Sequence, residues 1–213
     1  MKRILLGTTN PSKGKRFRDL LREYAVEFYT LADLGITDEP AETGKTPEEN
    51  AGIKARYYGR YFDAVICNDS GLYFDGLPLD DPRQPGLNIR APQGRRLDDE
   101  EMISYYSGLI RSLGGRVSAY YLDGIAVFYA GKTTTFMGKD TARQSAFVMV
   151  DTPSQTRHPG WPLDSISINK NTGTYFTESG DNKYDTDDEN IMVGRYRQRL
   201  TAFLAEALGL ERL

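Results

Sequence analysis

The sequence is poor in residues that cross-link chains or bind soft metals, with one cysteine and one histidine among 213 residues. Cys67 has no second thiol to pair with inside the chain, which excludes a disulfide scaffold and favours a reducing cytoplasm. Positive charge is not in excess either, because the formal net charge is -3. A protein that neutralises a nucleic-acid backbone needs clustered lysine and arginine, so we expect no nucleic-acid polymer as a partner.

Long apolar runs are also lacking. No stretch approaches the roughly 20 apolar residues that cross a bilayer. Met1 to Arg3 precede only three strongly apolar residues, Ile4 to Leu6, which is too short for a signal peptide. We therefore expect a cytoplasmic protein with no membrane partner. A chain of 213 residues suits one α/β domain, which we expect to span residues 1–213.

Two helices are predicted to begin beside polar segments in the first sixty residues. Residues 3–7 are typical of a buried strand, and Asn10 before Pro11 has the pattern of an N-cap followed by proline at the first helical position. Thr46 and Glu49 have the spacing of a capping box, which predicts a second helix starting at residue 47.

The rest of the chain alternates between strand and helix patterns. Residues 64–67 are typical of a central strand, and the polar residues 68–71 are expected to form a loop at its end. Residues 75–96, which include four prolines, are predicted to be irregular, and a helix is predicted at 98–113. Two or three antiparallel strands follow within 117–150, with a turn at 130–132. An acidic solvated loop is predicted at 179–190, before an amphipathic C-terminal helix that contains Leu200, Phe203, Leu204 and Leu208. These elements predict a mixed α/β fold.

The polar segment after the first strand is a candidate anion site. Free backbone N–H groups and the helix dipole favour negative charge at a helix N-terminus. Hydroxyl, amide and ammonium groups come from Thr8, Thr9, Asn10, Ser12 and Lys13. The segment is not a Walker A loop, because Gly14-Lys15 has the wrong spacing and Arg16 replaces Ser/Thr. A capped helix with an exposed lysine explains this segment alone equally well.

Two carboxylates from different segments could bind one hard cation. Glu42 precedes Thr43-Gly44, and Asp69 follows the apolar strand. Magnesium commonly takes one or two protein carboxylates and completes its coordination with water and phosphate oxygens. A solvated surface glutamate and an Asp-Ser-Gly turn are the alternatives for these residues. A capping role accounts for Glu49 without a metal.

The order of these segments resembles that of the non-canonical purine nucleoside triphosphate pyrophosphatases, the inosine triphosphatase-like family. The match is close through residue 72, and a weaker pattern continues to the C-terminus. It rests on Thr9-Asn10-x-x-Lys13, on Glu42-Thr43-Gly44-x-Thr46-x-x-Glu49-Asn50-Ala51-x-x-Lys54-Ala55, and on Asp69-Ser70-Gly71-Leu72. The resemblance implies a mixed, twisted sheet with flanking helices in two lobes around a central cleft, and a homodimer.

The resemblance also implies a reaction, in which a nucleoside triphosphate and water give the monophosphate and pyrophosphate without a covalent intermediate. Asp69 would be the catalytic carboxylate that helps bind Mg²⁺ and orients or deprotonates the attacking water, and Glu42 would complete the metal site. Lys54 would add positive charge. The remaining contacts to substrate are assigned to Thr8, Thr9, Asn10, Lys13 and Ser70.

Several positions depart from the family pattern, mainly on the side that binds the base. Asn68 replaces the first of two aspartates, and the aromatic base-stacking motif corresponds to Trp161-Pro162-Leu163-Asp164. Trp161 and Asp164 are therefore assigned to base binding, although a tryptophan in the core or in an interface is an equal alternative. A Ser-His-Arg motif retains only Arg195, which is also assigned to the base. His158 matches no family position and is expected to be a partly exposed loop residue.

The leading hypothesis is a Mg²⁺-dependent enzyme that hydrolyses inosine, deoxyinosine or xanthosine triphosphate. The first alternative is the same chemistry with an altered base preference, because a changed pocket alters discrimination without affecting the phosphate site. The second is a nucleotide-binding module without turnover. The presence of Lys13, Glu42 and Asp69 argues against the second alternative, since a pure binder has less need of a catalytic carboxylate.

Overall fold

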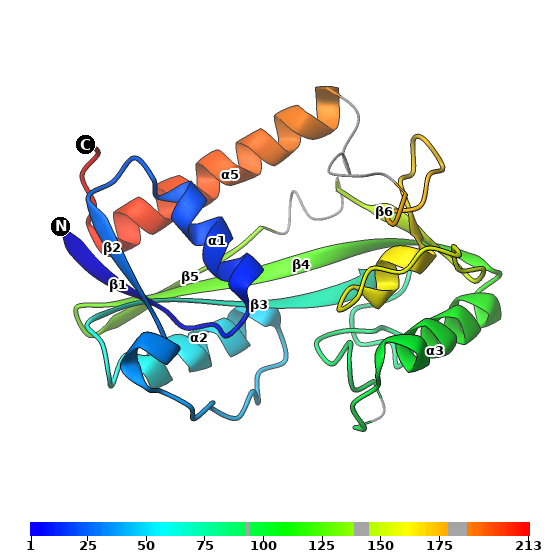
Figure 1. The fold of residues 1–213 in the computed structure, drawn as a ribbon, viewed down its shortest axis with the longest axis horizontal. Coiled ribbons are helices and arrows are strands. Elements are labelled where there is room, and N and C mark those ends of the chain that lie inside the picture. Colours follow the sequence, from blue (N-terminus) through cyan, green and yellow to red (C-terminus); the bar gives the residue numbers. More distant parts are fainter. Residues whose placement is uncertain (93, 139–144, 179–186) are drawn as a thin grey trace. The chain divides into compact units, whose positions relative to one another are not determined.

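The computed structural model describes residues 1–92, 94–138, 145–178 and 187–213, without the side chains of Ser12 and residues 187–193 (Figure 1). The chain divides into two compact units, which are described separately. Unit 1 comprises Met1–Ser70, Asp123–Gly138 and Gly194–Leu213, and unit 2 comprises Gly71–Leu122 and Lys139–Val193. One domain spanning residues 1–213 therefore stays a prediction.

Strands and helices both occur throughout the described residues. The strands are β1 (Lys2–Leu6), β2 (Val26–Thr30), β3 (Ala64–Phe74), β4 (Arg116–Tyr129), β5 (Lys132–Met137), β6 (Phe147–Val150) and β7 (Ser167–Ile168). The helices are α1 (Pro11–Leu20), α2 (Pro47–Tyr58), α3 (Asp99–Ser112) and α5 (Asp187–Leu208), with short 3-10 helices η1 (Ala32–Leu34) and η2 (Pro162–Ile166). The predicted α/β class is confirmed.

The sheet contains both parallel and antiparallel pairs, as predicted. In unit 1, β1 pairs in parallel with β2 and with β3, and it aligns Leu5 with Tyr29 and Val65. The strand order there is β2-β1-β3-β4, and β5 pairs antiparallel with β4. In unit 2, β4 pairs antiparallel with β6, which pairs antiparallel with β7.

Strand β3 is longer than the sequence pattern predicts. The expected loop at 68–71 is wrong, because these residues continue the strand to Phe74. Asn68 and Asp69 are buried, and the Asn68 side chain donates a hydrogen bond to the Gly124 carbonyl of β4. Neighbouring strands and buried partners override the turn preference of single residues. Asp69 therefore projects from the middle of a strand.

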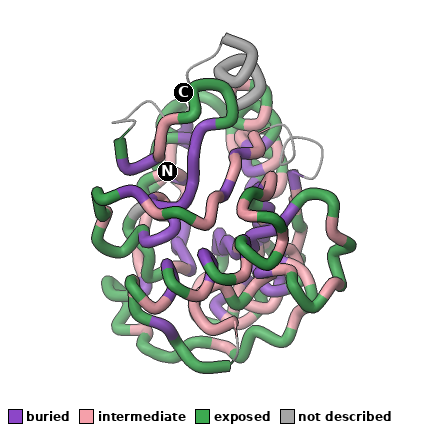
Figure 2. Tube along the Cα trace, turned by 90° about the vertical axis from the view of Figure 1, so that its right-hand side faces the viewer, coloured by how far each residue is buried: buried purple, intermediate pink, exposed green. Residues whose placement is uncertain are grey.

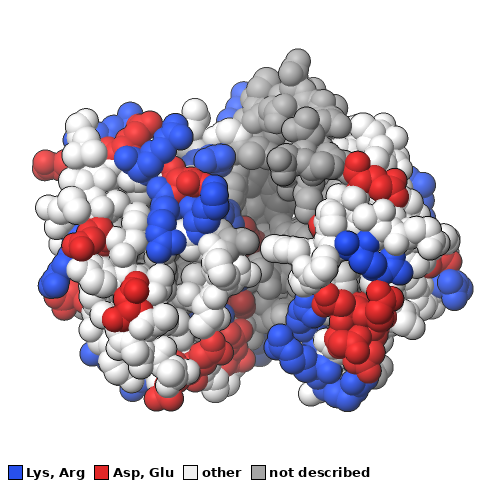
Figure 3. All heavy atoms as spheres, in the orientation of Figure 1, with Lys and Arg blue, Asp and Glu red and all other residues white. Residues whose placement is uncertain are grey.

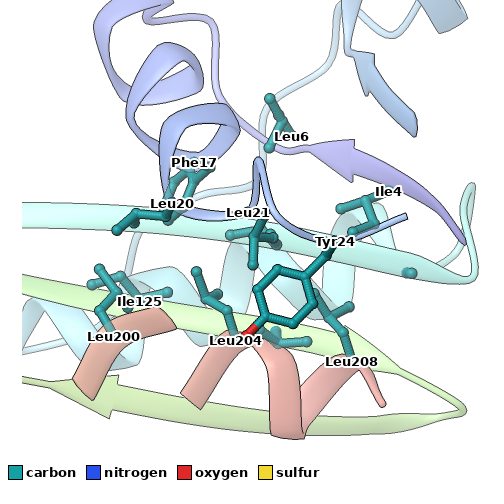
Figure 4. Close-up of a cluster of buried hydrophobic side chains, with 13 residues drawn as sticks. Ile4, Leu6, Phe17, Leu20, Leu21, Tyr24, Ile125, Leu200, Leu204 and Leu208 are labelled. Carbon is teal, nitrogen blue, oxygen red and sulfur yellow. The ribbon is translucent and has the colours of Figure 1, made fainter. Parts of the chain in front are cut away.

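Both faces of the unit 1 sheet are covered by helices. On one face, α1 and α5 pack on β1, β3 and β4 (Figure 4). On the other face, Leu5 and Cys67 belong to a buried cluster with Ala51 and Tyr58 of α2. Because alternate residues of a strand point to opposite faces, a strand that is buried on both sides has a continuous run of apolar residues. Along the trace, buried residues form continuous stretches in some segments and alternate with exposed residues in others (Figure 2).

The start of α2 confirms the predicted cap. The Thr46 hydroxyl accepts a hydrogen bond from the Glu49 backbone N–H at 3.1 Å. The Glu49 carboxylate accepts from the Lys45 N–H at 2.6 Å, one residue before the partner that a full capping box would use. A capping role thus accounts for Glu49.

Unit 2 has its own core beneath α3. Asp98 and Glu101 form a complete capping box at the start of this helix, close to the predicted start. Its buried side chains include Met102, Tyr106 and Ile110, which pack with residues of β3, β4, β6 and η2. Acidic side chains gather next to basic ones over the start of α3 (Figure 3), where the ion pairs are Arg90–Asp99, Arg95–Glu101 and Arg157–Glu100.

The connecting segments agree with the sequence predictions in part. Within residues 75–96, the described residues form no helix or named strand, and Ala130 and Gly131 make the turn between β4 and β5. Helix α5 begins at Asp187, so the predicted acidic loop is wrong for residues 187–190, and residues 179–186 lie outside the described part of the chain. None of the helices described is both long and apolar enough to span a membrane.

Candidate functional site

The predicted anion loop lies at the N-terminus of α1. The Asn10 side-chain oxygen accepts a hydrogen bond from the Lys13 backbone N–H at 3.3 Å, which confirms Asn10 as the cap. The Thr8 hydroxyl accepts from the Asn10 N–H at 3.1 Å, and Thr9 is exposed. Hydroxyl and amide groups are therefore arranged at the positive end of a helix dipole, where anions bind favourably.

Lys13 lies one turn into α1 with a half-buried side chain. Burial lowers the pKa of Lys13, with a further lowering from Lys54, while Asp69, Asp123 and Glu42 oppose the shift. Its ammonium forms no hydrogen bond or ion pair with any residue that the structure describes. A partly desolvated cation without a direct partner is stabilised by an anionic ligand.

Two carboxylates converge on Lys54 from different segments. The Lys54 Nζ lies 2.5 Å from Glu42 Oε1 and 3.7 Å from Asp69 Oδ1. Burial disfavours the charged lysine, but the hydrogen bond to Glu42 and the charge of Asp69 raise the pKa of Lys54 above its usual value. The Lys54 and Asp69 side chains are only 18% and 13% exposed. Their electrostatic interaction is therefore weakly screened by solvent.

Asn50 holds this cluster together, although the sequence analysis assigned it no role. Its Nδ2 donates to Asp69 Oδ2 at 3.0 Å, and its Oδ1 accepts from the Gly44 N–H at 2.8 Å. A Cβ at Gly44 would lie 2.6 Å from Asn50 Oδ1, so this close approach requires glycine. One side chain thus fixes both Asp69 and the loop that carries Glu42. An asparagine beside Ala51 on the buried face of a helix was the available signal.

Next to Asp69, Asn68 has a buried side-chain oxygen that is a hydrogen-bond acceptor. Its Nδ2 donates to the carbonyl groups of Asp69 and Gly124 at 3.0 and 3.2 Å. Its Oδ1 is buried and has no hydrogen-bond partner among the described residues. Buried polar atoms are usually satisfied, so this oxygen is a candidate acceptor for a water molecule. Ser70, which follows Asp69 in β3, is half-buried.

The donor set fits a magnesium ion in type and number. No group of three or more histidine, cysteine, aspartate or glutamate side chains suited to a metal occurs in the described part of the chain. Magnesium, however, usually takes only one or two carboxylates and keeps water and phosphate oxygens in its other positions. Glu42 and Asp69 supply two carboxylates beside the same ammonium group. They could hold such an ion together with a phosphate.

Arg16 forms a second charged network that the sequence analysis missed. One guanidinium nitrogen donates to Asp123 Oδ2 at 2.7 Å, and the other donates to the Tyr196 hydroxyl at 3.0 Å. Burial opposes its charge, but Asp123 raises the pKa of Arg16. The residue links α1 to β4 and α5 within one turn of Lys13, and it therefore fixes the helix that carries the candidate anion loop.

Unit 2 presents Trp161 and Asp164 from one tight turn. Trp161 is 54% exposed, which excludes a role in the core. The Asp164 backbone N–H donates to the Trp161 carbonyl at 3.1 Å, and the Asp164 side chain is 13% exposed. His158 is a loop residue as predicted, and its Nδ1 lies 3.2 Å from Asp164 Oδ2. Arg195 belongs to unit 1, where it is exposed on α5.

Comparisons with known sequences identify relatives of this chain. Residues 4–178 match the model of the Ham1 family. A dITP/XTP pyrophosphatase of Thermoanaerobacter pseudethanolicus is 35% identical over 142 residues, which cover 64% of this chain and 68% of the relative. A dITP/XTP pyrophosphatase of Bacillus subtilis is 32% identical over 139 residues, which cover 63% of this chain and 67% of the relative.

Solved structures share the fold along almost the whole chain. A HAM1 protein from Coxiella burnetii superposes with a TM-score of 0.70 at 22% identity and covers 97% of this chain and 100% of its own. The Staphylococcus aureus Ham1 protein gives a TM-score of 0.67 at 21% identity and covers 94% of this chain and 99% of its own. Together with the sequence matches, these likenesses agree with the mixed α/β architecture described above.

Proposed function

Because the chain belongs to the Ham1 family, we propose that it is a nucleoside triphosphate pyrophosphatase acting on inosine, deoxyinosine or xanthosine triphosphate. One observation carries the proposal within the molecule itself. Lys13 is a half-buried cation with no described partner, and it lies within electrostatic range of Asp69, Lys54 and Glu42. A site of this composition suits a phosphate chain and the carboxylates that act on it.

The roles of the phosphate-side residues follow from their chemistry. The hydroxyl and amide groups of Thr8, Thr9 and Asn10 donate to phosphate oxygens at the start of α1, and Lys13 neutralises their charge. Lys54 adds positive charge between Glu42 and Asp69, and Ser70 contacts the substrate. In phosphoryl transfer, positioning and charge neutralisation of this kind provide most of the acceleration.

Asp69 is proposed to orient and deprotonate the attacking water. The water oxygen forms a bond to the α-phosphorus, the bond from that phosphorus to the bridging oxygen breaks, and pyrophosphate leaves with the electron pair. The proton passes to the Asp69 carboxylate. Asn50 holds one oxygen of that carboxylate, which leaves Oδ1 on the side of Lys54. A general base needs a fixed orientation toward the proton that it accepts.

Glu42 and Asp69 are proposed to hold Mg²⁺. When bound, the ion would neutralise phosphate charge and polarise the reacting phosphoryl group. The convergence of both carboxylates on Lys54 supports this assignment. Equilibrium dialysis with Mn²⁺ as a probe should show binding that Glu42→Gln weakens. Equal Mn²⁺ binding by the variant would remove Glu42 from the metal site.

On the base side, Trp161, Asp164 and Arg195 are proposed to contact the purine. The exposed indole of Trp161 suits stacking on a base, and the Asp164 carboxylate suits accepting a hydrogen bond from a base N–H.

We also propose that the protein is a cytoplasmic homodimer. Light scattering after size-exclusion chromatography measures its mass in solution and so tests the oligomeric state. A single-chain mass in solution would contradict the dimer.

The reaction is tested with purified protein, Mg²⁺ and a panel of common and deaminated triphosphates, with pyrophosphate and monophosphate measured separately. Deaminated purines should be hydrolysed fastest, to equal amounts of both products. Hydrolysis with another base order would favour the same chemistry with an altered preference. Nucleotide binding without products would favour the binding module, and release of orthophosphate would contradict the proposed bond cleavage.

The residue test is Asp69→Asn, which should abolish turnover while the protein stays folded. Asp63→Asn is the matched control, because Asp63 is an exposed aspartate just before β3. The control should retain the activity of the wild type. Full activity in the Asp69 variant would remove this residue from the mechanism.

A further inference from the structure

The segment formed by residues 158–164 is held in place by polar contacts to the backbone of Gly160. Asp99 Oδ2 accepts a hydrogen bond from the Gly160 N–H at 2.7 Å, and Arg90 donates to the Gly160 carbonyl at 3.0 Å. Asp99 and Arg90 also pair with each other at 2.9 Å. The Trp161 N–H donates to the His158 carbonyl at 2.9 Å. The exposed indole is thus carried by a loop with a defined backbone conformation.

Within this loop, His158 acts on the carboxylate of Asp164. Its Nδ1 lies 3.2 Å from Asp164 Oδ2. An ionised carboxylate only accepts hydrogen bonds, so the ring nitrogen that faces it carries a proton and donates. A carboxylate has about four acceptor positions, and this donor occupies one of them and restrains the rotation of the group. The aspartate therefore has a defined orientation before any ligand arrives.

We infer that His158 is a positioning residue for base selection, which holds Asp164 so that its carboxylate accepts the N1–H of a 6-oxopurine stacked on Trp161. This inference rests on the proposed function. Hypoxanthine and xanthine carry a hydrogen on N1, whereas adenine has a lone pair there. A carboxylate fixed opposite N1 attracts the first two bases and repels the third. Sites built around one directed hydrogen bond discriminate strongly against ligands that cannot make it.

The chain offers a direct readout, because Trp161 is its only tryptophan. Quenching of its fluorescence by inosine monophosphate or adenosine monophosphate, measured at equilibrium with EDTA present, reports stacking without any turnover. The wild type should bind inosine monophosphate more tightly. In His158→Ala the ratio of the two affinities should fall by about tenfold, the scale of one lost hydrogen bond to a charged group.

Three variants distinguish positioning from a merely structural role. His158→Asn keeps an N–H near the place of Nδ1 and should retain most of the preference. In an Asp164→Asn background, His158→Ala should have no further effect on the ratio, because its partner is already altered. Thr156→Ala, an exposed position in the same segment, is the matched control and should behave as the wild type.

The outcomes separate this inference from the proposed function. Equal weakening of both nucleotides in His158→Ala, or an undiminished effect in the Asp164→Asn background, would overturn the role of His158. Pyrophosphate release without any quenching would leave the proposed function standing and overturn the inference. Selective quenching that is lost in His158→Ala, in a protein that hydrolyses no triphosphate, would support the inference and overturn the proposed function.

Discussion

Lys13 and Lys54 lie in one cluster of charges in unit 1, but the protein treats them differently. Lys54 is held by Glu42 and Asp69, and its pKa is raised despite burial. Lys13 has no direct partner among the described residues, and burial lowers its pKa. The described residues thus satisfy Lys54 and provide no direct partner for Lys13. We therefore expect Lys54 to contribute mainly to the stability of the cluster and Lys13 mainly to the proposed activity.

Among the variants that test this difference between the lysines, Lys13→Met should have the largest effect on activity and no adverse effect on stability. Loss of a cation that faces developing phosphate charge should lower kcat/KM by about 10²–10³-fold. The Tm should stay equal or rise, because the variant removes a partly desolvated charge that has no direct partner in the described part of the chain. Lys15→Met, an exposed neighbour paired with Asp19, is the control and should change neither quantity appreciably.

The pH dependence of stability sharpens this prediction. Since the folded-state pKa of Lys13 is lowered, the unfolded chain binds the proton more tightly, and stability rises as pH increases through the folded-state value. The advantage of Lys13→Met over the wild type should therefore be largest at neutral pH and shrink in alkaline solution. Urea unfolding across this range measures it. If Lys13→Met were less stable than the wild type at neutral pH, the folded protein would stabilise the charged Lys13, and the proposed difference between Lys13 and Lys54 would be contradicted.

Lys54→Met should act in the opposite direction on stability. It leaves the largely buried Asp69 carboxylate and the partly exposed Glu42 carboxylate without their shared cation, which should cost about 1–3 kcal/mol in the free energy of unfolding at neutral pH. Because the pKa of Lys54 is raised, its stabilisation is fully present below the unfolded-state value and is lost as pH rises through the folded-state value. Equal stability of variant and wild type at neutral pH would show that Lys54 is no better satisfied than Lys13.

Gly44→Ala tests the support of Asp69 with a smaller expected change. The added Cβ would lie 2.6 Å from Asn50 Oδ1 and should displace the amide that holds Asp69. We expect the free energy of unfolding to fall by about 1–3 kcal/mol and kcat to fall by about tenfold. Gly108→Ala is the control, because its Cβ meets nothing within 4 Å in α3. The control should be more stable by about 0.5–1 kcal/mol. An unchanged kcat in Gly44→Ala would show that the contact of Asn50 with Asp69 does not contribute to the reaction.

Local patterns predicted most of the helices well. The Thr46 cap, the α3 helix and the apolar stripe of α5 depend on residues close in sequence, and each occurs where the sequence predicts it. The turn at Ala130-Gly131 is likewise local. It places both residues at positive φ, 50° and 74°, as a two-residue hairpin turn requires.

Features that depend on distant partners were missed or wrong. The short strand β2 had no clear pattern and exists because β1 pairs along its full length. Residues 68–71 have turn-forming types, yet β3 continues because Gly124 of a distant strand binds Asn68. The contacts of Asn50 and Arg16 also join residues that no spacing rule connects. The motifs include Glu42, Lys54 and Asp69, whereas the groups that hold these side chains come together only in the folded chain.

The division of unit 1 into three chain segments has a consequence for its synthesis. Leu200, Leu204 and Leu208 of α5 complete the cluster formed by Ile4 and Phe17 near the other end of the chain (Figure 4). While the chain emerges from the ribosome, that apolar face stays without its cover until the last helix has been made. The nascent protein therefore carries every proposed phosphate-binding residue while this apolar face is still uncovered, and an exposed face of this kind favours aggregation during that interval.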